Sequence, residues 1–367
     1  MPPIRWRLNL ANLQPNLGAL TRDGTLITGS GDVVTAIDRD GKILWNFTNG
    51  PSLGSVAVGS NTDLYFAGYR QGTRRLVCLD SSGRFRWDQR AVVIDGYPPV
   101  LAPDGTVLTS GTDRELHAFS PDGKPVWTFD IGSATYGPPL IRPDGTSIVL
   151  GPIPGAGLRL IGPDGKSRGA FSTHRFTNEP NLRQATLGPD GTLYLAGSGA
   201  EFLRAVTPGG PVRWTVELDL DAASRPIVDS TGRIILTAKN SRTEHFEILA
   251  ISPKGSVEWR RDLGVSYADS SPALGTDGSI FLTSGEPALW CLKPDGTVRW
   301  KYRLPRPIQW VKLQRNSLAS WSLFVRELFR TPRAIAHTPP WVAPDGSVRV
   351  GLAGAQGYLL SIERPLP

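Results

Sequence analysis

The chain of 367 residues has little of what several kinds of functional site require. It contains two cysteines, four histidines and one methionine, so neither a disulfide framework nor a cysteine-rich metal centre is expected. No apolar run approaches the roughly 20 residues of a membrane-spanning helix. No glycine-rich phosphate loop followed by Lys and Ser or Thr is present, and the Gly-Ser-Gly-Asp string at 29–32 stands alone.

Turn-forming residues, by contrast, are abundant. The chain has 41 Gly and 32 Pro beside 40% hydrophobic residues, a composition typical of many short strands around a large core. Its unit is residues 36–45, in which a strand end at Ala36 leads through Asp40-Gly41 to a strand that contains Trp45. Glycine after Asp supplies the positive φ of a hairpin turn, so the two strands should pair antiparallel. The Ala36 position recurs at 78, 118, 160, 205, 250 and 291, and repetition every 40 residues or so indicates a propeller or a solenoid.

Each repeat also has an earlier turn of similar chemistry, which gives four strands, A to D, per repeat. These turns are Asp23-Gly24, Asn61-Thr62, Asp104-Gly105, Asp144-Gly145, Asp190-Gly191, Thr231-Gly232, Asp277-Gly278 and Asp345-Gly346. The eighth copy is divided between the termini, because Ser361 matches the Ala36 position and residues 4–8 supply the strand with a tryptophan. We therefore predict an all-β, eight-bladed propeller of four-stranded antiparallel blades over residues 1–367, closed by the N-terminal strand. Closure removes exposed sheet edges.

The repeated Ala-x-Asp…Gly…Trp pattern resembles the pyrroloquinoline-quinone-like β-propeller repeats over nearly the whole chain. These repeats occur in quinoprotein dehydrogenases and in the lipoprotein of the Bam complex. The resemblance implies that each tryptophan packs between neighbouring blades, which we expect of Trp45, Trp87, Trp127, Trp214, Trp259 and Trp300. The turn at Asp40-Gly41 is one residue shorter than the corresponding turn of quinoprotein repeats. Phe171 replaces the tryptophan in the fourth blade, and we expect looser packing there.

The same resemblance raises pyrroloquinoline quinone with Ca²⁺ as a cofactor. Quinoprotein dehydrogenases of this kind use a catalytic Asp, a calcium ion and often a disulfide between adjacent cysteines. This chain has no adjacent cysteines, and its recurrent Asp residues are expected to cap turns. We therefore predict no catalytic residues, no cofactor and no metal site. Cys78 and Cys291 are interpreted as core residues, and His117 and His245 are too scattered in the sequence to indicate metal binding.

Candidate ligand-binding residues come just before each strand A, on the face of the variable loops and near the axis. Most of these positions are polar or aromatic: Asp95, Tyr97, Tyr136, Arg183, Arg225, Tyr267, Asp269 and His337. Variable loops on a rigid scaffold are a common place for binding. Two interpretations stay open: a hydrated channel rim, or a small-molecule or glycan pocket with arginines for anionic groups and tyrosines for stacking.

One insertion, residues 303–338, interrupts the repeat between the seventh and eighth blades. Over 303–333 it carries seven Lys or Arg residues against Glu327, which is +6 of the formal charge of +7. Apolar residues at helical spacing over 317–330 predict an amphipathic helix. This helix either packs on the propeller or docks on a negatively charged partner or an anionic membrane surface. The candidate contacts are Arg315, Trp321, Arg326, Arg330 and Arg333.

Two classes of function follow. The first is a non-catalytic binding scaffold that presents its variable face to a protein or glycan, in association with the envelope or a membrane. The second is an enzyme at the channel rim, either a quinoprotein dehydrogenase or a polysaccharide lyase or hydrolase. A monomer is expected, and nucleic acid is not, because no recognition motif occurs. No leader is visible, which predicts a cytoplasmic protein, or a periplasmic or extracellular one if a leader is removed.

Overall fold

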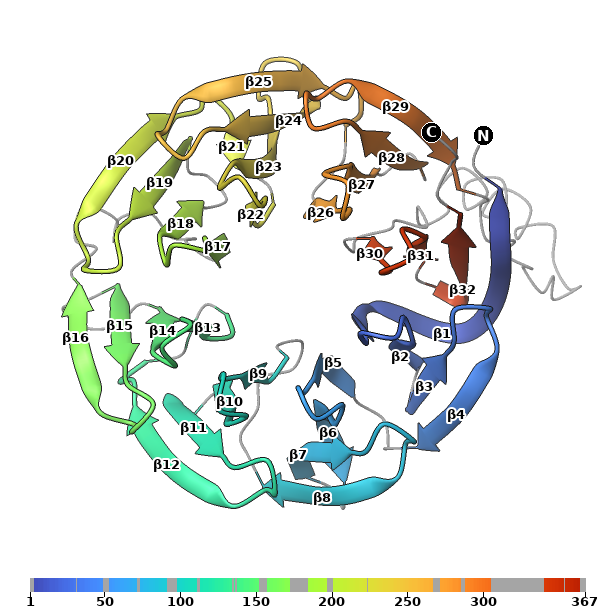
Figure 1. Ribbon diagram of the computed structural model, residues 1–367, viewed down its shortest axis with the longest axis vertical. Coiled ribbons are helices and arrows are strands. Elements are labelled where there is room, and N and C mark those ends of the chain that lie inside the picture. Colours follow the sequence, from blue (N-terminus) through green and yellow to red (C-terminus); the bar gives the residue numbers. More distant parts are fainter. Residues whose placement is uncertain are drawn as a thin grey trace, which may run out of the picture.

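The protein is a closed ring of eight blades around a central axis (Figure 1), as the repeat predicts. The computed structural model describes residues 3–30, 32–48, 53–70, 73–90, 98–110, 113–133, 135, 137–151, 157–171, 184–196, 201–222, 224–266, 271–284, 288–304, 340–352 and 354–363. Each blade is an antiparallel sheet with strand A nearest the axis and strand D on the outer circumference.

The strands follow one another in simple up-and-down order within each blade. Blades one to four consist of β1 (Ile4–Leu20), β2 (Leu26–Ser30), β3 (Val33–Ile37), β4 (Ile43–Thr48); β5 (Leu53–Val58), β6 (Leu64–Arg70), β7 (Thr73–Leu79), β8 (Phe85–Arg90); β9 (Val100–Leu101), β10 (Val107–Ser110), β11 (Glu115–Phe119), β12 (Pro125–Asp130); and β13 (Leu140–Ile141), β14 (Ser147–Leu150), β15 (Leu158–Ile161), β16 (Ser167–Phe171). Blades five to eight consist of β17 (Gln184–Leu187), β18 (Leu193–Ala196), β19 (Phe202–Val206), β20 (Val212–Glu217); β21 (Asp221–Ala222), β22 (Ile227–Val228), β23 (Ile234–Lys239), β24 (Phe246–Ile251), β25 (Val257–Asp262); β26 (Ala273–Leu274), β27 (Ile280–Ser284), β28 (Ala288–Leu292), β29 (Val298–Arg303); and β30 (Trp341–Val342), β31 (Val348–Leu352), β32 (Gly354–Ile362).

The ring is closed by β1, which belongs to two blades. Its first half pairs antiparallel with β32, with Trp6 opposite Ser361, and its last residues pair with β2. The hydrogen-bonded sheets of blades eight and one are therefore continuous through this strand, and Figure 1 shows the two chain ends side by side. The predicted pairing of residues 4–8 with the last blade is confirmed.

The core lies between neighbouring blades. Strands B and C are buried along their length, as in β23 and β24, whereas D strands alternate between exposed and half-buried side chains, as in β25. Successive side chains of a strand point to opposite faces of the sheet, so each inner strand supplies apolar groups to both adjoining interfaces. Val34, Ala36, Leu64 and Phe66, for example, form one cluster between blades one and two.

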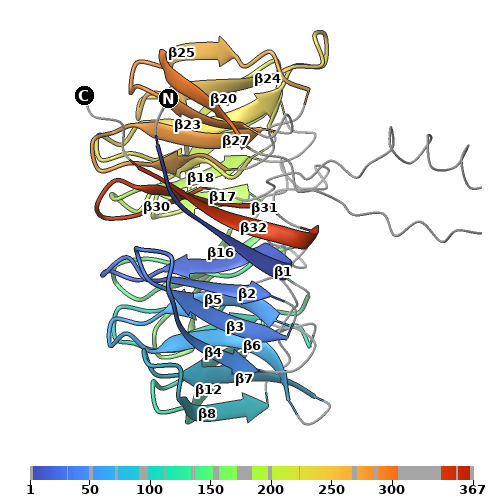
Figure 2. The same ribbon diagram turned by 90° about the vertical axis from the view of Figure 1, so that its right-hand side faces the viewer.

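The hairpin turns form as their sequence predicts. Gly24 has a φ of 85° and Gly41 a φ of 85°, and Asp38 Oδ1 accepts hydrogen bonds from the amides of Asp40 and Lys42 at 2.9 and 2.8 Å. Such Asp side chains satisfy the turn backbone locally. Because strands alternate in direction, the A–B and C–D turns share one face of the ring, called here the turn face (Figure 2). The B–C and D–A connections lie on the opposite loop face.

The tryptophans dock blade on blade. Each indole Nε1 donates to a backbone carbonyl in the C–D turn of the next blade, and the ring covers the glycine of that turn. The pairs are Trp6–Arg39, Trp45–Ser81, Trp87–Pro121, Trp127–Pro163, Trp214–Pro253 and Trp259–Pro294, at 2.8 to 3.0 Å. A Cβ at Gly41 would meet Trp6 Cγ at 2.7 Å, so only glycine fits there. The predicted packing of tryptophans between blades is confirmed.

Trp300 departs from this pattern in one respect. It packs with Val342 and the core between blades seven and eight. Its buried Nε1, however, has no hydrogen-bond partner among the described residues. The residues at the C–D turn position of blade eight, 364–367 and 1–2, lie outside the described residues.

The expectation of looser packing at Phe171 is wrong. Phe171 lies so close to Gly210 that a Cβ there would be 1.8 Å from the ring. Phenylalanine cannot donate a hydrogen bond, and Arg142 Nη2 instead donates to the Pro208 carbonyl at 2.8 Å. Pro208 is the turn residue whose carbonyl an indole would otherwise reach, so an arginine from the A–B turn of the same blade as Phe171 replaces the missing donor.

The predicted amphipathic helix over 317–330 lies outside the described residues, as does most of the 303–338 insertion. The described part of the chain consists of strands and turns. Within it, no helix of the length and hydrophobicity needed to cross a membrane occurs.

Candidate functional site

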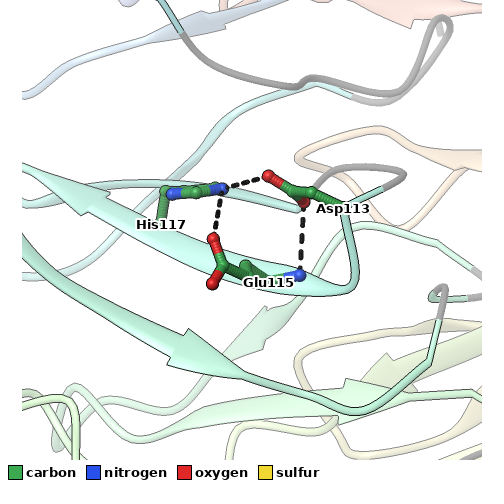
Figure 3. A group of neighbouring side chains, drawn as sticks. All are labelled: Asp113, Glu115 and His117. Carbon is green, nitrogen blue, oxygen red and sulfur yellow. Dashed lines mark hydrogen bonds and ion pairs between the residues drawn. The ribbon is translucent and has the colours of Figure 1, made fainter.

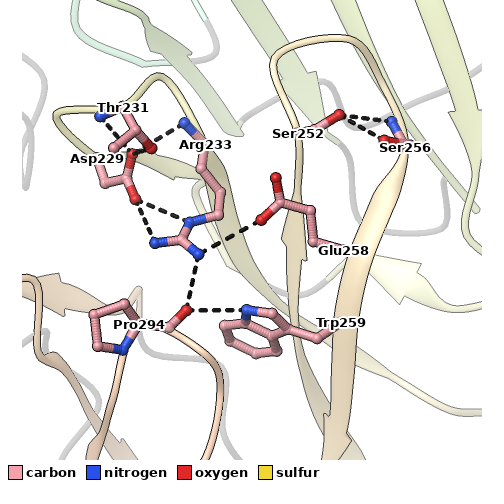
Figure 4. A network of polar contacts seen from close by, with 8 residues as sticks. All are labelled: Asp229, Thr231, Arg233, Ser252, Ser256, Glu258, Trp259 and Pro294. Atoms are coloured by element: carbon pink, nitrogen blue, oxygen red, sulfur yellow. Dashed lines mark hydrogen bonds and ion pairs between the residues drawn. The ribbon is translucent and has the colours of Figure 1, made fainter.

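The turn face uses its polar groups to join one blade to the next. Figure 4 shows the junction of blades six and seven, where Arg233 pairs with Asp229 at 2.9 Å and donates to the Pro294 carbonyl at 2.9 Å. Trp259 Nε1 donates to the same carbonyl at 3.0 Å, and Thr231 Oγ1 donates a hydrogen bond to Asp229 Oδ1. The Asp229 pKa is lowered because these hydrogen bonds outweigh its burial. Donors and acceptors here are consumed within the protein, so this junction is structural.

Of the predicted rim residues, the structure describes Arg225 alone. The other seven lie outside the described residues, and so do all five contact candidates of the insertion: Asp95, Tyr97, Tyr136, Arg183, Tyr267, Asp269, His337, Arg315, Trp321, Arg326, Arg330 and Arg333. Their convergence on the axis and their role in docking therefore stay predictions.

Arg225 lies directly before β22, the innermost strand of blade six, on the loop face. Its surface is exposed, yet desolvation by the surrounding protein lowers the pKa of its guanidinium. The side chain is thus reached by water and crowded by protein atoms at the same time. It makes no hydrogen bond or ion pair with any described residue. An arginine in this setting can form charge-assisted hydrogen bonds with an incoming carboxylate or phosphate.

A group of side chains that the sequence analysis did not recognise lies in blade three. Asp113, in the turn before β11, and Glu115 and His117, on β11, converge on one side of this strand (Figure 3). His117 Nε2 is 2.7 Å from Asp113 Oδ2 and 3.7 Å from Glu115 Oε2. The sequence carried only part of this signal. Glu115 and His117 are residues i and i+2 of one strand and share a face, whereas Asp113 joins them from the turn before β11, where Arg114 has a φ of 67°. The sequence analysis considered each histidine by itself and therefore did not recognise this group.

Among the described residues, Asp113, Glu115 and His117 make up the group of His, Cys, Asp or Glu side chains placed closely enough to hold a metal ion. The two cysteines are separate and buried. Burial raises the pKa of Cys78 to about 12 and that of Cys291 to about 11. Both thiols are therefore neutral at physiological pH and occupy the core position that alanine fills in other blades, as predicted.

Comparison with known proteins agrees with this fold. The family profile described as outer membrane protein assembly factor BamB matches residues 30–149 and 244–315, together just over half of the chain. No curated protein sequence matches the chain.

Among solved structures, BamB from Moraxella catarrhalis has a TM-score of 0.68 at 15% identity, covering 100% of this chain and 99% of that one. The C-terminal WD40 domain of Sif2 has a TM-score of 0.69 at 10% identity, covering 99% of each chain. Virginiamycin B lyase from Staphylococcus aureus has a TM-score of 0.51 at 11% identity, covering 98% of each chain. At these identities the structural likenesses concern the fold alone, whereas the profile match shows the family. The chain belongs to the family of the outer membrane protein assembly factor BamB, among the pyrroloquinoline-quinone-like β-propellers.

Proposed function

We propose that the protein is a non-catalytic scaffold of the cell envelope that binds a protein partner on its loop face. Membership of the BamB family supports a protein-binding propeller. The similarity to virginiamycin B lyase, an enzyme, extends to the fold only and adds no catalytic residue to this chain. A glycan bound at the axial rim is the alternative ligand for the same loop face.

The observation that carries the proposal is Arg225, which has no partner among the described residues, unlike the paired charged groups found on both faces of the ring. On the turn face, carboxylates such as Asp38 and Asp229 and guanidinium groups such as Arg233 are paired with backbone or with each other. On the loop face, Arg225 stands at the axial end of blade six without a partner among the described residues. A partner that supplies an acidic group beside the axis would complete the hydrogen bonding of this arginine.

Placing a photo-crosslinking amino acid at position 225 and, as a matched control, at position 22 tests this proposal in cells. Arg22 is an exposed arginine next to the A–B turn of blade one, on the turn face. We expect a discrete adduct of higher mass from position 225 and none from position 22. Equal labelling from the two positions, or none from either, would contradict a partner on the loop face.

The basic insertion gives a second contact in the same proposal. The positive charge over 303–333 fits an anionic membrane surface, since basic residues with Trp and Leu are the mixture that binds such surfaces. Changing Arg326, Arg330 and Arg333 to Glu reverses three charges, and we expect binding to vesicles with anionic lipid to be lost in a sedimentation assay. Vesicles of zwitterionic lipid alone are the control. If the unaltered protein does not sediment with anionic vesicles, membrane docking by this segment is wrong.

A further inference from the structure

We propose that Asp113, Glu115 and His117 form a binding site for a divalent transition metal ion, of which Zn²⁺ is the best fit. Mixed carboxylate and imidazole ligands suit Zn²⁺ and its neighbours better than Ca²⁺ or Mg²⁺, which prefer oxygen. This site is separate from the partner contacts proposed above and lies at the edge of blade three where the B–C loop meets β11.

The three side chains already have nearly the spacing that a zinc ion demands. Ligands at 2.0 to 2.1 Å in a tetrahedral arrangement are about 3.3 Å from one another. The observed separations from His117 Nε2, 2.7 Å to Asp113 and 3.7 Å to Glu115, fall on either side of that value. All three ligand atoms lie within 4.8 Å of one another, so modest side-chain movements would bring them to this spacing.

The site is also oriented and accessible. The other ring nitrogen of His117, Nδ1, lies 3.5 Å from Thr128 Oγ1 on the neighbouring strand, and the ring stacks on Phe119. An outer partner of this kind holds the imidazole so that Nε2 faces the metal. The side chains of His117 and Asp113 are 17% and 23% exposed. An ion can thus enter from solvent and retain water in its remaining coordination positions.

The local charge is unbalanced, and this independently favours a cation. Glu115 lies directly opposite Asp130 in the β11–β12 pair, and like charges in this position destabilise a sheet. With Asp113, three carboxylates face one imidazole. No Lys or Arg forms an ion pair with any of the three within the described part of the chain.

Blade six shows how the same acidic pair is neutralised elsewhere. There Glu247 lies opposite Asp262, in the same register as Glu115 and Asp130. Arg260 binds Glu247 at 2.9 Å, and His245 contacts Asp262 at 3.1 Å. The residue of blade three at the position of Arg260 is Thr128, which carries no charge. Arg260 thus neutralises the acidic pair of blade six, whereas no Lys or Arg of the described residues does so in blade three.

Isothermal titration of the whole protein with ZnCl₂ tests the proposal. We expect one saturable site per chain, weakened at least about tenfold by His117→Gln and by Asp113→Asn, because each removes a ligand atom. The matched control is His245→Gln, which removes the histidine that contacts Asp262 in blade six, where Arg260 already neutralises the acidic pair. Its zinc affinity should equal that of the unaltered protein.

Two results would overturn the proposal. One is the absence of saturable zinc binding by the unaltered protein. The other is an affinity of the His117→Gln protein equal to that of the unaltered one, which would place bound zinc at another site. Titration with CoCl₂ adds a spectroscopic readout, because the visible ligand-field bands of Co²⁺, which are weak in water, become much stronger when a protein binds the ion in four- or five-coordinate geometry. This increase should disappear in the same two variants.

Discussion

Replacing Arg349 by phenylalanine is expected to raise the free energy of unfolding by about 1 to 4 kcal/mol. Arg349 lies in β31 and is fully buried, with 0% of its surface exposed. None of its three guanidinium nitrogens has a hydrogen-bond partner within the described residues. Burial lowers the pKa of this group, and the attraction of Asp345 opposes the effect only in part. A buried charge without hydrogen bonds opposes folding.

Other blades show that an aromatic residue fits this position. Arg349 lies opposite Ser361 on the neighbouring strand. Tyr65 and Phe281 occupy the same position in blades two and seven, opposite Cys78 and Cys291. Those aromatic rings lie 5.9 and 6.1 Å from the docking tryptophan of their own blade, and the Arg349 guanidinium lies 5.8 Å from the Trp6 ring. The cation–π contact offsets part of the desolvation, by about 2 kcal/mol at most.

Guanidinium chloride denaturation of the Arg349→Phe protein measures this effect. The reverse exchange in blade seven, Phe281→Arg, is the matched control and should shift the denaturation midpoint downward. A lower midpoint for Arg349→Phe would contradict the prediction. It would mean that Asp23, Asp38 and Asp345, which all attract this cation, stabilise it by more than its desolvation costs.

Removing the side chain of Trp6 should open the ring. Trp6→Ala deletes the ring that covers Gly41 and the hydrogen bond to the Arg39 carbonyl. We expect a loss of about 3 kcal/mol in the free energy of unfolding, the lower end for a packed tryptophan because Trp6 is partly exposed. The amides of residues 357–362, which pair with β1, should also exchange with deuterium faster than those of β24, an inner strand distant from the closure.

A comparison of two phenylalanine variants isolates the hydrogen bond from the packing. Trp6→Phe keeps an aromatic ring but leaves the Arg39 carbonyl without its donor, so a loss of about 1 kcal/mol is expected. Trp300→Phe serves as control, because the Nε1 of Trp300 has no hydrogen-bond partner among the described residues. Equal shifts of the denaturation midpoint in these two proteins would show that the indole hydrogen bond contributes nothing to closure.

The repeat made most of the fold predictable. A period of about 40 residues, the Asp-Gly turns, an unpaired tryptophan strand at the N-terminus and a last repeat without one define eight blades and the pairing of Trp6 with Ser361. These are local or periodic signals, and a strand that lacks a partner at one terminus can only complete the blade that lacks a strand at the other. The packing of Trp45 between neighbouring blades likewise followed from the resemblance and was confirmed, and the structure adds that the ring lies on Gly83.

The candidate site was predictable only in part. The position of Arg225 two residues before β22 followed from counting along the repeat, and its role in binding stays a prediction. The other rim candidates and the insertion stay predictions. The Asp113, Glu115 and His117 group was missed, because only Glu115 and His117 share a strand face and Asp113 is brought to them by the turn before β11.

The sequence by itself determined the number of blades, the turns and the closure of the ring, because these depend on backbone propensities that repeat along the chain. Only the tertiary structure decided what happens where the repeat is broken. It showed that Arg142 replaces a missing indole donor, that Arg349 is buried without hydrogen bonds, and that the acidic pair of blade three lacks the arginine of blade six. The reason is physical: such contacts join residues from different strands or blades, and their distances exist only once the ring has closed.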